Sequence, residues 1–226
     1  MNTNEVTIVL AHGAWADGSS WSEVIAPLQS HGFAVVAAPL PLTSLRDDVA
    51  ALDRTLERTT GPVVLAGHAY AGAVIAASAQ PRVRSLVFVA ALAPDEGETV
   101  AELFYREPPH PAAPQLAPDA HGLLWLPEPA FAAAFAQHVP PERAALFAAT
   151  QRPIAVACIQ ERAPRPAWRA KPSWFLLAEE DRMINPATQR FMAERMGARI
   201  RAAKVDHTPL ASAPQLVVDL IREAAQ

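Results

Sequence analysis

The stretch VVLAGHAYAGAVIAAS, residues 63–78, decides the fold. Its first four apolar residues predict a buried strand, the segment Gly67-His68-Ala69-Tyr70-Ala71 predicts a sharp turn, and the alanine-rich run that follows predicts a helix. A strand, turn and helix in this order form the elbow that usually presents a nucleophilic serine, in the pattern Gly-x-Ser-x-Gly. Here Ala69 occupies the apex. The stretch therefore predicts a nucleophile position whose side chain carries no nucleophile.

Composition excludes several other classes of protein. The chain of 226 residues is 51% hydrophobic and 19% charged, which is the balance of one soluble globular domain. Its net charge of −4 and its scattered basic residues argue against a nucleic-acid surface, and its apolar runs are too short to span a bilayer. The residues after Met1 do not form a basic region followed by an apolar stretch, so no signal peptide is expected and a cytoplasmic location is predicted. Cys158 stands alone, so neither a disulfide nor a metal cluster is expected, and no cofactor is predicted.

Short apolar runs alternate with amphipathic stretches on both sides of the elbow. This alternation predicts an α/β fold, with a parallel six-stranded sheet and helices on both faces. The strands are expected at residues 6–12, 33–40, 62–67, 83–93, 173–183 and 199–207. Besides the helix after the elbow, helices are expected at residues 19–32, 44–59, 187–197 and 213–225.

Residues 94–171 break this alternation. They hold many of the chain's 22 prolines, and only short amphipathic pieces lie between them. Because long loops without secondary structure are rare in compact domains, we expect a helical lid without strands, inserted in a core formed by residues 1–93 and 172–226. The alternative is a proline-rich excursion on the surface.

Four groups follow predicted strands, at the edge where open α/β sheets bind their ligands. The turn Gly13-Ala14 and the turn residue Tyr70 can each direct a backbone N–H into a site, as an oxyanion hole requires. Asp181 follows the fifth strand and His207 the sixth. An imidazole oriented by a carboxylate is a common acid–base device, so we expect Asp181 and His207 to form a hydrogen-bonded dyad beside Ala69. Glu179 and Glu180 are the rival acids.

The segments HGAW, GHAYAG, APDEGET and EEDRMINP, together with the late histidine, resemble the α/β-hydrolase superfamily. Within it, the chain is most similar to the small esterases and hydroxynitrile lyases. The resemblance covers nearly the whole chain and implies the fold and the chain order of apex, acid and histidine. It also implies a serine at position 69 and a glycine at position 71, where this chain has alanine. Ala71, Gly67 and Gly72 are still small enough for the elbow, so we expect its geometry to survive while acyl-enzyme chemistry through residue 69 is excluded.

Aromatic and histidine side chains near these groups are candidates for a substrate pocket. We expect Trp15, His68, Phe104 and Trp125 to line it, although each could equally belong to the core. The elbow holds Tyr70 near the same place.

Other residues near the predicted site receive structural roles. His12 is expected to order the turn after the first strand. Neither Ser19 nor Ser20 lies on an elbow, and one of them is expected to cap the next helix. Cys158 is expected to lack the charged neighbours that activate a thiol.

Three functions fit these observations. The first is an enzyme without a serine nucleophile, in which His207, oriented by Asp181, activates water or removes a proton from a small, mostly apolar carbonyl or ester-like compound. The reaction is then hydrolysis, lyase or isomerase chemistry, or oxygen chemistry without a cofactor. The second is a serine hydrolase whose nucleophile was replaced by alanine, and the third is a binder of small ligands without activity. Each implies a small-molecule partner, without nucleic acid or membrane, and each allows a homodimer.

Overall fold

Six strands form one parallel sheet in the computed structural model, which describes residues 6–226. The strands are β1 (Thr7–Ala11), β2 (Ala34–Ala38), β3 (Val63–His68), β4 (Val83–Val89), β7 (Ser173–Ala178) and β8 (Arg199–Ala203). Their order in the sheet is β2-β1-β3-β4-β7-β8, and every neighbouring pair is parallel. This arrangement confirms the predicted fold class.

Burial separates the central strands from the two edges. Every residue of β1, β3 and β7 is buried, whereas β2 and β8 alternate between exposed and covered positions. A parallel strand with helices on both faces reads as a continuous apolar run, which is why the central strands were the easiest to predict.

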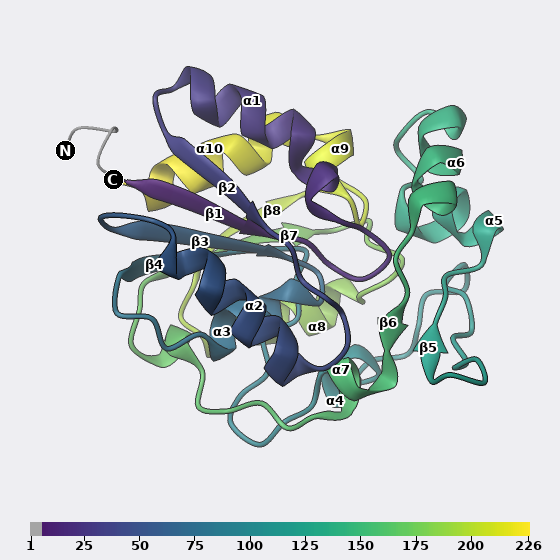
Figure 1. Ribbon diagram of the computed structural model, residues 1–226. Helices are drawn as coiled ribbons and strands as arrows, with labels where there is room; N and C mark the ends of the chain where they lie inside the picture. The colour runs from purple at the N-terminus through teal and green to yellow at the C-terminus, as the bar shows by residue number, and fades with distance from the viewer. Residues whose placement is uncertain (1–5) are drawn as a thin grey trace.

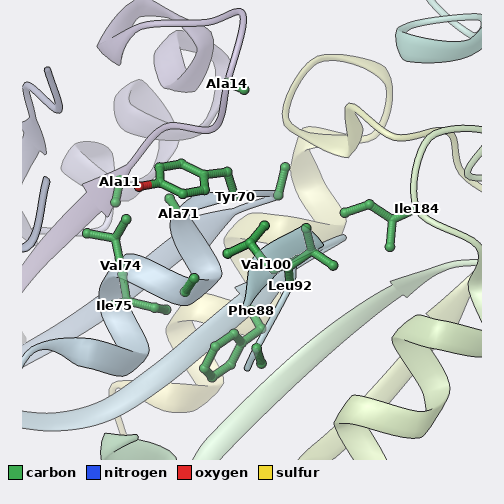
Figure 2. Close-up of a cluster of buried hydrophobic side chains, with 14 of the residues drawn as sticks. Ala11, Ala14, Tyr70, Ala71, Val74, Ile75, Phe88, Leu92, Val100 and Ile184 are labelled. Atoms are coloured by element: carbon green, nitrogen blue, oxygen red, sulfur yellow. The ribbon is translucent and has the colours of Figure 1, made fainter. Parts of the chain in front are cut away.

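Helices cover both faces of the sheet (Figure 1). On one face lie α1 (Ser22–Ser30) and α10 (Pro214–Ala224), and on the other lie α2 (Leu45–Glu57), α3 (Ala71–Ala77) and α8 (Pro186–Arg195). Two separate hydrophobic clusters result, one on each face. Figure 2 shows part of the second face, where Ala71, Val74 and Ile75 of α3 lie beside Phe88 of β4.

The sequence explains where these helices begin. Ser44 caps α2 by accepting a hydrogen bond from the N–H of Asp47, as short polar side chains do at this position. Pro186 and Pro214 are the first residues of α8 and α10, where the missing N–H of proline costs nothing. Along α2, Leu45, Leu52 and Leu56 are buried, as the spacing predicts.

Most of residues 94–171 lie at the carboxyl ends of the strands, and the last residues of this segment run back to the start of β7 (Figure 1). The segment forms mostly short helices. These are α4 (Val100–Phe104), α5 (Glu128–Ala130), η3 (Phe131–Phe135), α6 (Pro141–Thr150), α7 (Val156–Gln160) and η4 (Ala167–Arg169). Part of the proline content is explained by helix starts, since Pro140 and Pro141 open α6.

The expectation of an insert without strands is wrong. The segment contains a small antiparallel pair, β5 (Leu123–Leu124) with β6 (Ile154–Ala155). Strands of two residues are too short to show an alternating pattern, so the sequence carries no signal for them. No helix in the described part of the chain is both long enough and apolar enough to span a membrane.

Candidate active site

The elbow has the strained backbone that its sequence predicts. Ala69 connects β3 to α3 with φ of 51°, in the left-handed region that residues with a side chain rarely adopt. Three hydrogen bonds hold it there. Its N–H donates to the carbonyl of Val89 (3.2 Å), and its carbonyl accepts from the N–H groups of Leu92 (3.0 Å) and Gly72 (3.1 Å). The turn is therefore built as it would be for a nucleophile, although its side chain is a methyl group.

The residues around the apex must be small. A Cβ on Gly67 would lie 2.7 Å from the carbonyl oxygen of Ala71, and one on Gly72 would lie 2.8 Å from the Ala91 Cβ and closer still to the Leu92 oxygen. Ala71 itself is fully buried in the helix that follows. The elbow therefore tolerates alanine at position 71, but leaves no room for a Cβ at Gly67 or Gly72.

Asp181 and His207 are in contact. The Nδ1 of His207 lies 2.8 Å from an Asp181 oxygen, and both residues are only 2% exposed. Asp181 also accepts hydrogen bonds from the N–H groups of Met183 and Ile184 and from the side-chain amide of Gln189. The carboxylate is thus fixed by three bonds besides the one to the imidazole.

The two rival acids do not reach the histidine. Glu179 and Glu180 are exposed, and Glu180 instead pairs with His138 of the insert, at 3.0 Å. Of the three consecutive acids, Asp181 alone turns inward to His207. The histidine donates its Nδ1 hydrogen to this carboxylate, because a carboxylate can only accept, and its Nε2 is left with a lone pair.

His68 contacts both the backbone and the ring of His207. Its Nε2–H donates to the carbonyl oxygen of His207, at 2.7 Å, and the two rings lie 5.0 Å apart. Burial, and then the nearby charge of His207, lowers the pKa of His68 to about 3, so the ring stays neutral. His12 donates from Nδ1 to the carbonyl oxygen of Gly13 and accepts the N–H of Leu40, which places it in the predicted turn.

A cavity of about 580 Å³ lies between the dyad, the elbow and the insert. Its walls are almost entirely hydrocarbon, and His207 contributes an imidazole to them. The lining residues are Ala14, Trp15, Ala69, Tyr70, Leu92, Val100, Ala101, Phe104, Tyr105, Leu116, Leu124, Ile154, Ile159, Met183, Ile184 and His207. Tyr70, Leu92, Val100 and Ile184 are labelled in Figure 2.

Six of the nine predicted site residues line this cavity, whereas Asp181, Trp125 and His68 do not. Asp181 acts on the site only through its contact with His207. Ala14, Trp15, Ala69, Tyr70, Phe104 and His207 are among the walls of the cavity. Trp125 is not, since it is 47% exposed and its indole N–H bonds to Asp119. Side chains alternate along an extended segment, and Leu124 and Leu126 take the inward positions on either side. His68 faces a neighbouring cavity instead.

Most of the insert residues in these walls could not be predicted from the sequence. Leu116, Ile154 and Ile159 come from loops and very short elements. Only their apolar character pointed to burial, and it could not tell a wall from the core.

Tyr70 belongs to a buried polar group that the sequence did not reveal. Its hydroxyl donates to Asp48 at 2.7 Å, and the same carboxylate oxygen lies 3.6 Å from the Cys158 sulfur. The charged neighbour of Cys158 is therefore a negative one, which does not activate a thiol, so the expectation that Cys158 lacks activating charges is confirmed. Burial, and then the negative charge of Asp48, raises the pKa of the thiol to about 12, so it stays protonated and unreactive.

The two residues predicted to supply backbone donors, Ala14 and Tyr70, both line the cavity. The N–H of Trp15 bonds to the carbonyl of Arg152, but neither Ala14 nor Tyr70 has a backbone or side-chain acceptor for its N–H within residues 6–226. The helix cap expected of Ser19 or Ser20 is provided by Asp17, which accepts from the N–H and the hydroxyl of Ser19. In the described residues no three His, Cys, Asp or Glu side chains cluster as metal ligands would.

Known proteins share this architecture. Carbendazim hydrolyzing esterase from Nocardioides sp. (strain SG-4G) is 30% identical over 110 residues, so the match spans 42% of this chain and only 46% of that relative. Polyneuridine aldehyde esterase superposes with a TM-score of 0.85 at 19% identity, covering 98% of this chain and all of the other. A pyrethroid hydrolase from Sphingobium faniae JZ-2 superposes with a TM-score of 0.81 at 21% identity, covering 97% of each chain.

The two structural similarities are evidence for the fold alone, because both sequence identities are low. The family match reaches further along the chain, because it extends over residues 8–220 and so includes the elbow, the insert and the dyad. This chain belongs to the alpha/beta hydrolase family.

Proposed function

We propose that the protein is an enzyme that acts on a small, neutral, mostly apolar ester or carbonyl compound by general-base catalysis, without a covalent intermediate at residue 69. The observation that carries this proposal is the His207–Asp181 hydrogen bond of 2.8 Å beside a correctly built elbow that ends in a methyl group. Everything needed for acid–base chemistry is present, and the nucleophile alone is missing.

His207 is the base. Its Nδ1–H is held by Asp181, so the lone pair of Nε2 is available to accept a proton. In the hydrolytic reaction, a water molecule attacks the carbonyl carbon as Nε2 takes one of its protons. The resulting tetrahedral oxyanion then collapses, the bond to the leaving group breaks, and the imidazolium returns the proton to the departing oxygen. Removal of a proton from the substrate itself by the same Nε2 is the corresponding first step of lyase or isomerase chemistry.

The N–H groups of Ala14 and Tyr70 support the oxyanion. Both lack an acceptor in the described residues, and both residues line the cavity with Ala69 and His207. Donors of this kind, together with substrate binding, leave about 10³–10⁴-fold of catalysis even in proteases that have lost a triad residue. A site without a serine can thus still be an effective one.

The cavity indicates the class of substrate. Its walls carry neither a carboxylate nor a cationic side chain, so a charged ligand would lose its hydration without compensation there. The insert closes one side of the cavity through Val100, Phe104 and Leu116, which is the role of a lid. The relatives named above are esterases or hydrolases by name, and this supports an ester as the first substrate to try.

The test is turnover by the unaltered protein and its His207→Ala variant on a panel of neutral aryl and alkyl esters and ketones. We expect loss of about 10²–10⁴-fold in kcat/KM for any substrate that is turned over. His121→Ala, which changes an exposed histidine of the insert, is the matched control and should retain full activity. Equal turnover by the His207→Ala variant and the unaltered protein would contradict the proposal. Saturable binding without turnover would instead favour a ligand binder.

A further inference from the structure

A second cavity of about 470 Å³ lies on the other side of Trp15 from the one just described. Its walls come from the loop before η2 (Gly18–Trp21), from α9 (Pro209–Ser212) and from α6 of the insert, which lie toward the same end of the sheet in Figure 1. Trp15 lines both cavities. Phe135 and His68 line the second one and also lie against the ring of His207, with centroids 5.2 and 5.0 Å away.

Trp15 forms a fixed partition between the two spaces. Its backbone has φ of 57°, and its N–H and indole N–H bond to the carbonyl oxygens of Arg152 and Leu124, both at 3.0 Å. Phe135 meets it edge-on at 6.2 Å. Residues with a side chain rarely adopt this backbone conformation, and it persists only where the surrounding structure enforces it. The hydrogen bonds of the backbone N–H and of the indole N–H do so for Trp15.

The two cavities differ in chemistry. The first has hydrocarbon walls, whereas six polar side chains line the second: Asp17, Ser19, Ser20, His68, Thr150 and Thr208. Apolar side chains such as Phe135, Phe147 and Leu210 form the rest of the second cavity. Polar groups in such a wall are satisfied by a molecule that hydrogen-bonds to them.

The hydroxyl groups at the second cavity have already donated their hydrogens. Ser19 donates to the carboxylate of Asp17 at 2.6 Å, and Ser20 donates to the carbonyl oxygen of the same residue at 2.7 Å. Thr150 donates to the carbonyl of Leu146 at 2.9 Å. A hydroxyl has only one hydrogen, so each of these oxygens can only accept another bond.

The remaining polar side chains also accept. The hydroxyl of Thr208 is directed to Asp206, at 3.5 Å, and the ionised Asp17 has no hydrogen to give. His68 donates its Nε2 hydrogen to His207, and its buried Nδ1 has no partner in the described residues. The polar side chains of this cavity thus form a set of acceptors.

We propose that the second cavity is a binding site for the hydroxyl group of a small neutral alcohol. A set of acceptors is satisfied by a ligand that donates, and its most buried members, His68 and Thr208, are uncharged. In the hydrolysis proposed above, the leaving group of an ester has this chemistry. The assignment of the ligand as a reaction product rests on that proposed function, whereas binding itself does not.

The experiment compares an alcohol with the ether in which a methyl group replaces the hydroxyl hydrogen. Benzyl alcohol and benzyl methyl ether are titrated into the intact protein, and binding is followed by the methyl NMR signals of Leu210 and Ala211 in the second cavity and of Ile154 and Ile159 in the first. We expect saturable shifts of Leu210 and Ala211 with the alcohol. The ether should bind there about 10-fold more weakly, which corresponds to one net hydrogen bond.

Matched variants locate the effect. Thr208→Val removes one acceptor with little change of shape and should weaken alcohol binding several-fold, by roughly the value of one hydrogen bond. The control, Thr188→Val, makes the same change at a buried threonine of α8 outside both cavities and should leave binding unchanged.

Four results would overturn the assignment. These are equal binding of ether and alcohol, shifts confined to Ile154 and Ile159, binding of benzylamine but not of the alcohol, and no saturable shift at all. The last would mean that the site holds water only. Alcohol binding that persists in a His207→Ala variant, with no turnover by the unaltered protein on any substrate, would count against the proposed function and not against this site.

Discussion

The elbow at the end of β3 and the dyad after β7 and β8 are two halves of one site. The elbow has the backbone geometry of an α/β-hydrolase site without its side chain, whereas the dyad has both of its side chains. At the elbow the backbone is complete, with Ala69 at φ of 51° and its three backbone hydrogen bonds made, but the side chain is a methyl group. At the dyad the side chains are complete, and every oxygen of Asp181 has a partner. The difference teaches that, in the function proposed above, His207 carries the acid–base chemistry, while the elbow contributes geometry and a backbone donor.

The largest expected effect comes from weakening the dyad alone. Asp181→Asn should lower kcat by about 10²–10⁴-fold, because an amide cannot hold the Nδ1–H tautomer of His207 as a carboxylate does. The measurement is steady-state turnover at a temperature well below the unfolding transition of the variant, since the buried amide also meets three other donors. Glu180→Gln, on the same loop but exposed, is the matched control and should change kcat less than two-fold, as expected for a surface change. A fully active Asp181→Asn variant would remove the contrast between the two halves.

Substitutions at the elbow should change the stability of the protein. Gly72→Ala places a Cβ against the backbone of Leu92 and the Cβ of Ala91, so we expect it to lower the free energy of unfolding by about 1–3 kcal/mol or more. Ala71→Gly restores a smaller residue at the neighbouring position and should cost at most about 1 kcal/mol, from helix propensity. Urea unfolding of the two variants measures this difference. Equal stability would show that the close approach of strand and helix is not required.

A further expected effect is the pH dependence of stability that His68 causes, which is small near neutral pH. Because burial lowers the pKa of His68 to about 3, the unfolded chain takes up a proton below about pH 6.5 while the folded protein does not. The free energy of unfolding should therefore fall as the pH falls from about 6.5 toward 3, by at most about 1.4 kcal/mol per pH unit from this residue. His68→Gln removes the titrating group and should flatten this dependence, measured by urea unfolding at several pH values. An unchanged slope would show that His68 is protonated in the folded state.

The sequence predicted the parts of the site that follow central strands. The strands before Asp181 and His207 are continuous apolar runs, and the parallel sheet brings their carboxyl ends to one edge, so the contact between the two residues was foreseeable. The turn at Ala69 was foreseeable from its small flanking residues.

What the sequence could not show depends on side-chain direction in the insert and on long-range contacts. Trp125 was expected in the pocket and faces solvent, because its direction is decided by two short strands that carry no periodic signal. The Tyr70–Asp48 bond joins residues that are 22 positions apart, and nothing in their spacing predicts it. The second cavity depends equally on Trp15, whose strained backbone is visible only in the fold.

The central claim is that the reaction needs no hydroxyl at residue 69, and the Ala69→Ser variant tests it most directly. The measurement is steady-state turnover by the unaltered protein and this variant, on the best substrate of the unaltered protein and on simple aryl esters. We expect no gain on the first, because the hydroxyl fills space that the water or substrate oxygen needs. New activity on aryl esters is expected, since the elbow, the backbone donors and the dyad are in place for acyl transfer. A large increase on the same substrate would contradict the account and identify the protein as a serine hydrolase lacking its nucleophile.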